Sequence, residues 1–211
     1  MAARQSVAVL VAHPDDETLW AGGTLLAEES WSAFIGCACR ASDADRAPKF
    51  QRILKHLRAQ GRMADLDDGP EQLPLSDESV EQALLECLPS RQFDRVLTHS
   101  PRGEYTRHRR HEEVARAVLR LWLRGTLSAA ELWLFAYDDD GGRRLPRVLA
   151  NADIVRELPS ELWQRKHRLI TQDYGFDPGS WEARVTPHSE GFFRVTTAEH
   201  ARTWLGQSAN P

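Results

Sequence analysis

The strongest constraint on the fold of this chain is the regular alternation of short apolar runs with longer amphipathic stretches. Apolar runs of strand length that alternate with helix-length segments are typical of βαβ units, which build a mostly parallel sheet. We therefore predict an α/β fold. The predicted strands are Val7–Ala12, Ser32–Cys39, Met63–Leu66, Arg95–His99 and Leu132–Tyr137.

The segments between these strands carry helix signals. "APKFQRILKHLRAQG" has apolar residues at helical spacing, and we expect Gly61 to end this helix. Ser76 is the predicted N-cap of a helix that runs through Leu88, because two acidic residues follow it and suit the helix dipole. A further helix is expected to begin near His111, and one more to end near Gly175.

Length and composition favour a single domain over residues 1–211, with a C-terminal covering segment from about residue 151. The formal charge of −4 argues against nucleic acid or an anionic membrane as the main partner. No apolar run approaches the roughly 20 residues that span a bilayer, and no signal peptide is recognisable, so we expect a cytoplasmic protein. The oligomeric state leaves no trace in the sequence.

The motif "AHPDDE" places a histidine and acidic side chains directly after the first predicted strand. Carboxylates crowded at the end of a buried strand are unfavourable unless a positive charge lies among them. A divalent metal held by His13, Asp16 and one downstream histidine would supply that charge. The same acidic residues would repel a pyrophosphate, which excludes a dinucleotide-dependent oxidoreductase.

The downstream histidines are found in "GEYTRHRRH", which follows the fourth predicted strand. The carboxyl ends of parallel strands meet at one edge of the sheet, so this segment should lie beside the first motif. His108 and His111 are spaced to share one helix face, so one could bind the metal while the other donates to an oxyanion. Three protein ligands leave an open coordination position, and Asp15 is then free to act as general base.

The two motifs together, "AHPDDE" and "GEYxxHxxH", resemble the LmbE-like/PIG-L family of metal-dependent N-deacetylases. The resemblance implies a Rossmann-like, three-layer α/β/α fold and removal of acetyl groups from N-acetylglucosamine-type small molecules. It also implies Zn²⁺ as the cofactor, with His13, Asp16 and His111 as its ligands. Asp15 would be the general base, and His108 would be an imidazolium that stabilises the oxyanion.

Other positions resemble the family less closely. Arg46 matches an arginine that often follows the second strand, and we expect it to contact the substrate. Glu104 and Tyr105 either contact the substrate or hold the long loop in place. Arg110 stands where many members have the aspartate of HPDH. Its charge should lower the pKa of His108, and it could favour an anionic substrate.

These departures leave alternatives open. One is a metal-dependent amide or ester hydrolase that acts on an anionic non-sugar small molecule. Another is a binding module without turnover, although a free base such as Asp15 would contribute little to simple binding. Fe²⁺ is an alternative to Zn²⁺, because two histidines and a carboxylate can hold either ion.

Overall fold

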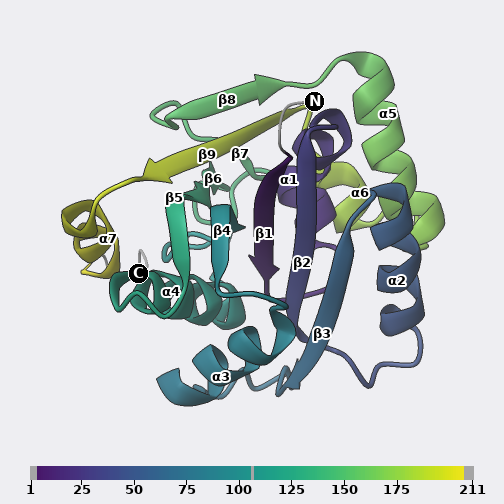
Figure 1. Cartoon of the computed structure of the whole chain (residues 1–211). Helices are drawn as coiled ribbons and strands as arrows, with labels where there is room; N and C mark the ends of the chain where they lie inside the picture. Colours follow the sequence, from purple (N-terminus) through teal and green to yellow (C-terminus); the bar gives the residue numbers. More distant parts are fainter. Residues whose placement is uncertain (1–3, 106, 207–211) are drawn as a thin grey trace.

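The computed structural model describes residues 4–105 and 107–206, which form an α/β fold (Figure 1). The central sheet has seven strands in the order β3-β2-β1-β4-β5-β9-β8. The first five in this order are parallel, whereas β9 pairs antiparallel with both β5 and β8. The strands are β1 (Gln5–Val11), β2 (Trp31–Cys39), β3 (Gln60–Leu66), β4 (Gln92–Thr98), β5 (Ser128–Phe135), β8 (Ile154–Glu157) and β9 (Ser189–Val195). The predicted α/β class and mostly parallel sheet are confirmed.

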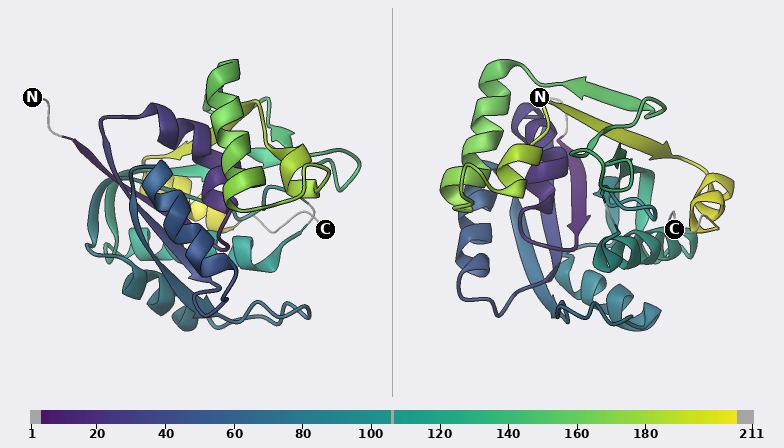
Figure 2. Two further views of the ribbon diagram at one scale, coloured as in Figure 1. Left: turned by 90° about the vertical axis from the view of Figure 1, so that its right-hand side faces the viewer. Right: turned by 180° about the vertical axis from the view of Figure 1, so that it is seen from behind.

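Helices cover both faces of the sheet (Figure 2). Successive residues of β1 point to opposite faces, so Val7, Val9 and Val11 join one core cluster while Ala8 and Leu10 join the other. The first cluster packs against α1 (Asp16–Ala27), α2 (Arg46–His56) and the π-helical turn η1 (Leu169–Asp173). The second packs against α3 (Asp77–Cys87), α4 (Arg109–Leu123) and α7 (Ala198–Leu205).

The predicted helix boundaries mostly hold. The Ser76 hydroxyl accepts a hydrogen bond from the backbone N–H of Ser79, as expected for an N-cap. The helix predicted near His111 begins two residues earlier, with His108 at its N-cap position. The helix predicted to end near Gly175 consists of α5 (Ser160–Arg168) followed by η1, and Gly175 adopts a positive φ of 76°.

The prediction that Gly61 ends a helix is wrong. The helix α2 ends at His56, and Arg58 takes the left-handed conformation that reverses the chain, with φ of 54°. Gly61 lies inside β3, where a Cβ atom would stand 2.6 Å from the carbonyl oxygen of Ile35. A close approach of two strands, and not a helix stop, accounts for this glycine.

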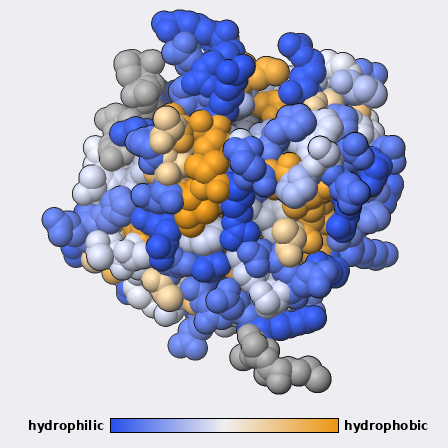
Figure 3. All heavy atoms as spheres, turned by 90° about the horizontal axis from the view of Figure 1, so that it is seen from above, coloured by the Kyte–Doolittle hydropathy of each residue, from blue (hydrophilic) through white to orange (hydrophobic). Residues whose placement is uncertain are grey.

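The C-terminal part of the chain extends the sheet as well as covering it. The strands β8 and β9 continue the sheet beyond β5, while α5 packs against α1. A two-stranded ribbon of β6 (Tyr137–Asp138) and β7 (Arg147–Val148) and the short helix α6 (Trp181–Val185) complete the described structure. Seen from above, the surface is mainly hydrophilic with small apolar areas between charged side chains (Figure 3). No helix within residues 4–105 and 107–206 is long and apolar enough to cross a membrane.

Candidate functional site

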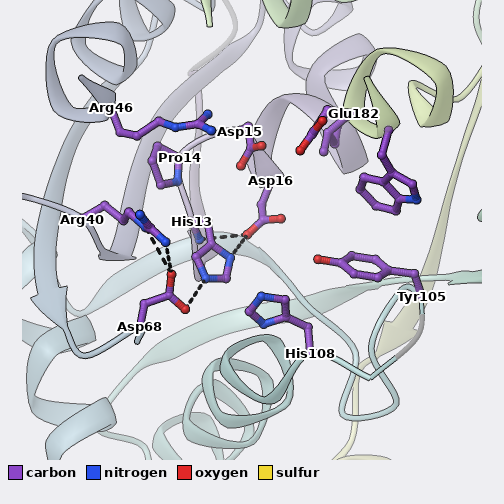
Figure 4. A pocket seen from close by; sticks show the side chains of 12 residues that line it. His13, Pro14, Asp15, Asp16, Arg40, Arg46, Asp68, Tyr105, His108 and Glu182 are labelled. Carbon is purple, nitrogen blue, oxygen red and sulfur yellow. Dashed lines mark hydrogen bonds and ion pairs between the residues drawn. The ribbon is translucent and has the colours of Figure 1, made fainter. Parts of the chain in front are cut away.

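The two sequence motifs meet where the order of strands reverses in the sheet. The neighbouring strands β1 and β4 end side by side, and the chain leaves them toward opposite faces into α1 and α4. In open α/β sheets this point forms a crevice that commonly binds ligands. A cavity of about 260 Å³ opens here (Figure 4). It is lined by His13, Pro14, Asp15, Asp16, Leu19, Arg40, Arg46, Asp68, Tyr105, His108, Trp181 and Glu182.

Three potential ligand atoms converge beneath this cavity. His13 Nδ1 lies 3.2 Å from Asp16 Oδ2 and 3.2 Å from His111 Nε2, and the last two atoms are 3.4 Å apart. A tetrahedral Zn²⁺ with bonds of about 2.0–2.1 Å requires its ligand atoms to stand about 3.3 Å from one another. The predicted set of His13, Asp16 and His111 therefore has the spacing that one small divalent ion needs.

Both histidines of this set are oriented by carboxylates on their far sides. His13 Nε2 lies 3.2 Å from Asp68 Oδ1, and His111 Nδ1 lies 2.6 Å from Glu104 Oε2. Asp68 is held in turn by the guanidinium of Arg40, at 2.6 Å. Metal-binding histidines in proteins commonly donate their second N–H to a carboxylate in this way, which fixes the ring and increases its basicity.

Histidines and carboxylates around the site shift the pKa values of one another. Burial opposes the charge on His13, but hydrogen bonds to Asp16 and Asp68 outweigh it and raise the pKa of His13 to about 10. Burial likewise opposes the charge on Glu104, yet the neighbouring His99 and His111 lower its pKa to about 2. A cation bound at His13 would replace a proton there, so metal binding should release protons.

His99 is fully buried and forms a second group of potential ligands with Asp16 and His111. His99 Nε2 lies 3.4 Å from Asp16 Oδ2, but it also accepts the backbone N–H of Ala12 at 3.0 Å. Its lone pair is therefore already engaged. His99 Nδ1 lies 3.0 Å from Glu104 Oε2, so the ring helps to position the carboxylate that orients His111.

Asp15 lines the cavity in a strained backbone conformation. Its φ of 127° is unusual for a residue other than glycine. The buried carboxylate of Glu17 accepts the Asp15 backbone N–H at 3.1 Å and the hydroxyls of Thr18 and Tyr174 at 2.6 and 2.8 Å. Burial, reinforced by the charge of Asp16, raises the pKa of Asp15 well above its ordinary value. A carboxylate of increased basicity in this place suits a general base.

His108 lies across the cavity from Asp15, and its ring centroid is 4.6 Å from that of His13. Burial and the charges of His111 and His13 lower the pKa of His108 to about 3. The predicted direction of this shift agrees, but the predicted cause, Arg110, does not. The imidazolium stays a prediction, and the lowered pKa opposes it, because it favours the neutral ring, which can donate from only one nitrogen.

Two predicted substrate contacts lie away from the cavity. Arg110 is 1% exposed, and its guanidinium binds the carbonyl oxygens of Asp67 and Leu73 and the carboxylate of Glu113. Glu104 is also 1% exposed and faces inward, toward His99 and His111. We therefore assign Arg110 to loop anchoring and Glu104 to histidine positioning, in place of substrate binding.

Arg46 and Tyr105, in contrast, reach the cavity as predicted substrate contacts should. Arg46 stacks over the ring of Phe176 at 4.4 Å, which holds its guanidinium beside Asp15. Tyr105 packs against Trp181, with ring centroids 4.7 Å apart. The polar ends of Arg46 and Tyr105 both face the cavity.

Sequence reasoning missed Asp68 and Trp181. Asp68 follows the end of β3. A polar residue directly after a predicted strand is the signal that identified His13 and Asp16, and the same signal was present at Asp68. Trp181 carries no such signal. It reaches the site from α6, far along the chain, because the C-terminal segment folds back over the ends of the parallel strands.

Solved structures resemble this chain in fold, whereas the other two comparisons found no match. No protein-family model matches the chain. No curated protein matches it either. Among solved structures, the N,N'-diacetylchitobiose deacetylase from Pyrococcus horikoshii in complex with its inhibitor MPG is similar, with a TM-score of 0.68 and 16% identity. The match covers 91% of this chain and 84% of that one.

Two further solved structures share the fold at similar coverage. The A40926 pseudoaglycone deacetylase Dbv21 has a TM-score of 0.60 and 15% identity, over 92% of this chain and 98% of that one. The 4-carboxy-2-hydroxymuconate hydratase GalB from Pseudomonas putida KT2440 has a TM-score of 0.62 and 15% identity, over 92% of this chain and 97% of that one. At identities of 15–16%, the likeness shows the fold alone. Because the same fold occurs in deacetylases and in a hydratase, activity must be argued from the site.

Proposed function

We propose that this protein is a metal-dependent N-deacetylase that removes an acetyl group from a small N-acetylated, sugar-type molecule. The observation that carries the proposal is the spacing of His13 Nδ1, Asp16 Oδ2 and His111 Nε2, all 3.2–3.4 Å apart, next to the cavity that Asp15 lines. Several solved structures with this fold are deacetylases, which supports the same reading.

The residues would take four roles: metal ligand, general base, oxyanion stabiliser and substrate contact. His13, Asp16 and His111 would hold the ion, for which Zn²⁺ is our first choice and Fe²⁺ the alternative. The bound ion would polarise the acetamide carbonyl and make a water molecule more acidic. Asp15 would take a proton from the attacking water, and its high pKa would let it pass that proton to the leaving amine.

His108 would stabilise the developing oxyanion as a neutral donor. A neutral imidazole can donate one N–H, and the position of His108 on the cavity wall places it beside the candidate ligands. Arg46 and Tyr105 would contact the substrate from the remaining sides. We also propose that the whole chain acts as one domain in the cytoplasm, without a nucleic-acid or membrane partner.

The test combines metal content with acetate release. We would load wild type, Asp15→Asn and Asp45→Asn with Zn²⁺ or Fe²⁺, measure the metal by elemental analysis, and assay N-acetylated sugars. Two metal ions are compared because a solved structure of similar fold is the zinc-inhibited form of teicoplanin deacetylase Orf2. Asp45 is the control, because its side chain is 66% exposed and forms a surface ion pair with Lys49 at 2.7 Å.

We expect all three proteins to bind one metal per chain, and acetate release to fall at least about 100-fold in Asp15→Asn alone. Equal turnover by Asp15→Asn and wild type, with equal metal content, would remove Asp15 from the mechanism. Wild type that binds metal but releases no acetate would contradict the N-deacetylase proposal.

A hydrolase that acts on an anionic non-sugar molecule is the second candidate. It is favoured by Arg46, whose guanidinium lines the cavity beside Asp15. The substrate panel therefore includes N-acetyl amino acids and anionic esters, and each assay follows loss of substrate as well as acetate. Turnover of these compounds alone would favour the second candidate.

A further inference from the structure

A second cavity adjoins the one that contains the candidate metal ligands. Its volume is about 490 Å³, and Tyr105 and Trp181 line both cavities. The two rings are in contact, with centroids 4.7 Å apart, so they form a common wall between the cavities. Tyr105 marks this side of the candidate site in Figure 4. A molecule bound beside Asp15 could therefore extend past the aromatic pair.

The sizes of the two cavities favour such an extension. Small-molecule sites usually have volumes of about 300–1,000 Å³. The first cavity, at about 260 Å³, is smaller than this range, whereas the two cavities together fall within it. The first cavity alone suits the reacting group and the ring that carries it, and the second offers room for a further ring or chain.

The chemistry of the second cavity is aromatic and basic on the side formed by α6. Trp181 is 37% exposed, which makes it one of three exposed large apolar residues in the described chain. Arg184 follows three residues later in α6 and so lies on the same helix face. Arg184 itself belongs to the lining of the cavity. An arginine beside an aromatic ring suits a ring that bears an anionic group.

The remaining charged side chains of this cavity come from the loop between β6 and β7. Arg144 is already paired with Asp138 at 2.8 Å, and the buried Asp139 adds a carboxylate to the lining. Arg184 is therefore the residue best placed to bind an added negative charge, because Arg144 is already neutralised by its own partner.

We propose that the second cavity is a subsite for a part of the substrate remote from its N-acetyl group, which bears a carboxylate or a phosphate. Arg184 binds that anionic group, and Trp181 contacts the ring or chain that carries it. This inference rests on the proposed N-deacetylase function, since it assigns the second part of the same substrate.

The test compares charged and neutral substrates of matched size. The neutral probe is N,N'-diacetylchitobiose, and the carboxylate probe is a disaccharide of N-acetylglucosamine and glucuronic acid. The phosphate probe is N-acetylglucosamine 1-phosphate, and its neutral control is the methyl glycoside of N-acetylglucosamine. The variants are Arg184→Gln and the control Arg143→Gln, whose side chain is 79% exposed and lies outside the lining of both cavities.

For Arg184→Gln we expect kcat/KM to fall about tenfold on at least one charged probe, mainly through KM, with no change on the neutral probes. Whichever charged probe shows the loss identifies carboxylate or phosphate. Arg143→Gln should match wild type on all probes. An Arg184→Gln variant that changes no probe, or lowers charged and neutral probes equally, overturns the subsite.

The failure of this inference can be distinguished from the failure of the proposed function by a binding measurement. Calorimetry with the same charged probes measures Kd for wild type and Arg184→Gln without any turnover. If no probe is hydrolysed by wild type, the N-deacetylase proposal fails, but about a tenfold higher Kd in Arg184→Gln still supports an anion subsite. Equal Kd values in the two proteins overturn it.

Discussion

The buried ion pair between Lys166 and Glu190 leads to the most quantitative prediction about this fold. Both side chains are 0% exposed, and Lys166 Nζ lies 2.7 Å from Glu190 Oε1. The same carboxylate accepts the backbone N–H groups of Gly23 and Thr24, each at 2.7 Å. The pair thus joins α5 and β9 to α1, which carries Asp16 of the candidate site.

Glu190→Gln should cost about 3–5 kcal/mol of unfolding free energy, because it leaves the Lys166 ammonium buried without a counter-charge. The glutamine amide can also present its NH₂ to a backbone N–H that needs an acceptor. With an m-value of about 2 kcal/mol/M, the urea midpoint should fall by roughly 1.5–2.5 M. Lys166→Met should cost less, because Glu190 keeps its two backbone donors.

The pH dependence of this variant has a definite sign. Burial lowers the pKa of Lys166 against the attraction of Glu190, and Glu190→Gln removes that attraction. The folded variant then binds fewer protons than the unfolded chain at pH values between the lowered pKa of Lys166 and the ordinary lysine pKa of about 10.4. Its unfolding free energy should therefore rise with pH relative to wild type.

Urea unfolding followed by circular dichroism is the assay, with Asp140→Asn as the control for an exposed pair. Asp140 pairs with Arg143, and their side chains are 52% and 79% exposed, so this variant should change stability by less than about 0.5 kcal/mol. The double variant Lys166→Met/Glu190→Gln should lose less than the sum of the two single variants. A loss below about 1 kcal/mol in Glu190→Gln would refute the reasoning.

Three further predictions concern residues placed by the structure. Asp68→Asn should weaken metal binding about 10- to 100-fold, because the His13 ring loses the carboxylate that orients it. Chelator competition measures the affinity, and Asp67→Asn is the control that should have little effect. Equal affinities in wild type and Asp68→Asn would show that Asp68 does not act on the site. Gly61→Ala should lower stability by about 1–3 kcal/mol in urea unfolding, because its Cβ would meet a carbonyl oxygen at 2.6 Å, and wild-type stability would contradict that contact. Arg110→Gln should lower stability by about 2–4 kcal/mol and leave KM unchanged, whereas a raised KM in a stable protein would restore Arg110 as a substrate contact.

The sequence by itself determined the class of fold and the two motifs of the candidate site. Strand-length apolar runs and helical spacing are local signals, so the parallel strands and the N-cap at Ser76 could be predicted from short windows. His13, Asp16 and His111 could be brought together because the carboxyl ends of parallel strands share one edge of the sheet.

Only the tertiary structure decided what surrounds those motifs. The contact of Asp68 with His13 joins residues 55 positions apart, and no local pattern encodes such a pairing. Arg110 carries the same charge as Arg46, yet one is buried by loop carbonyls and the other lines the cavity, since packing and not charge decides where a guanidinium points. The second cavity exists because α6 places Trp181 against Tyr105, a contact created only when the C-terminal segment folds across the sheet edge.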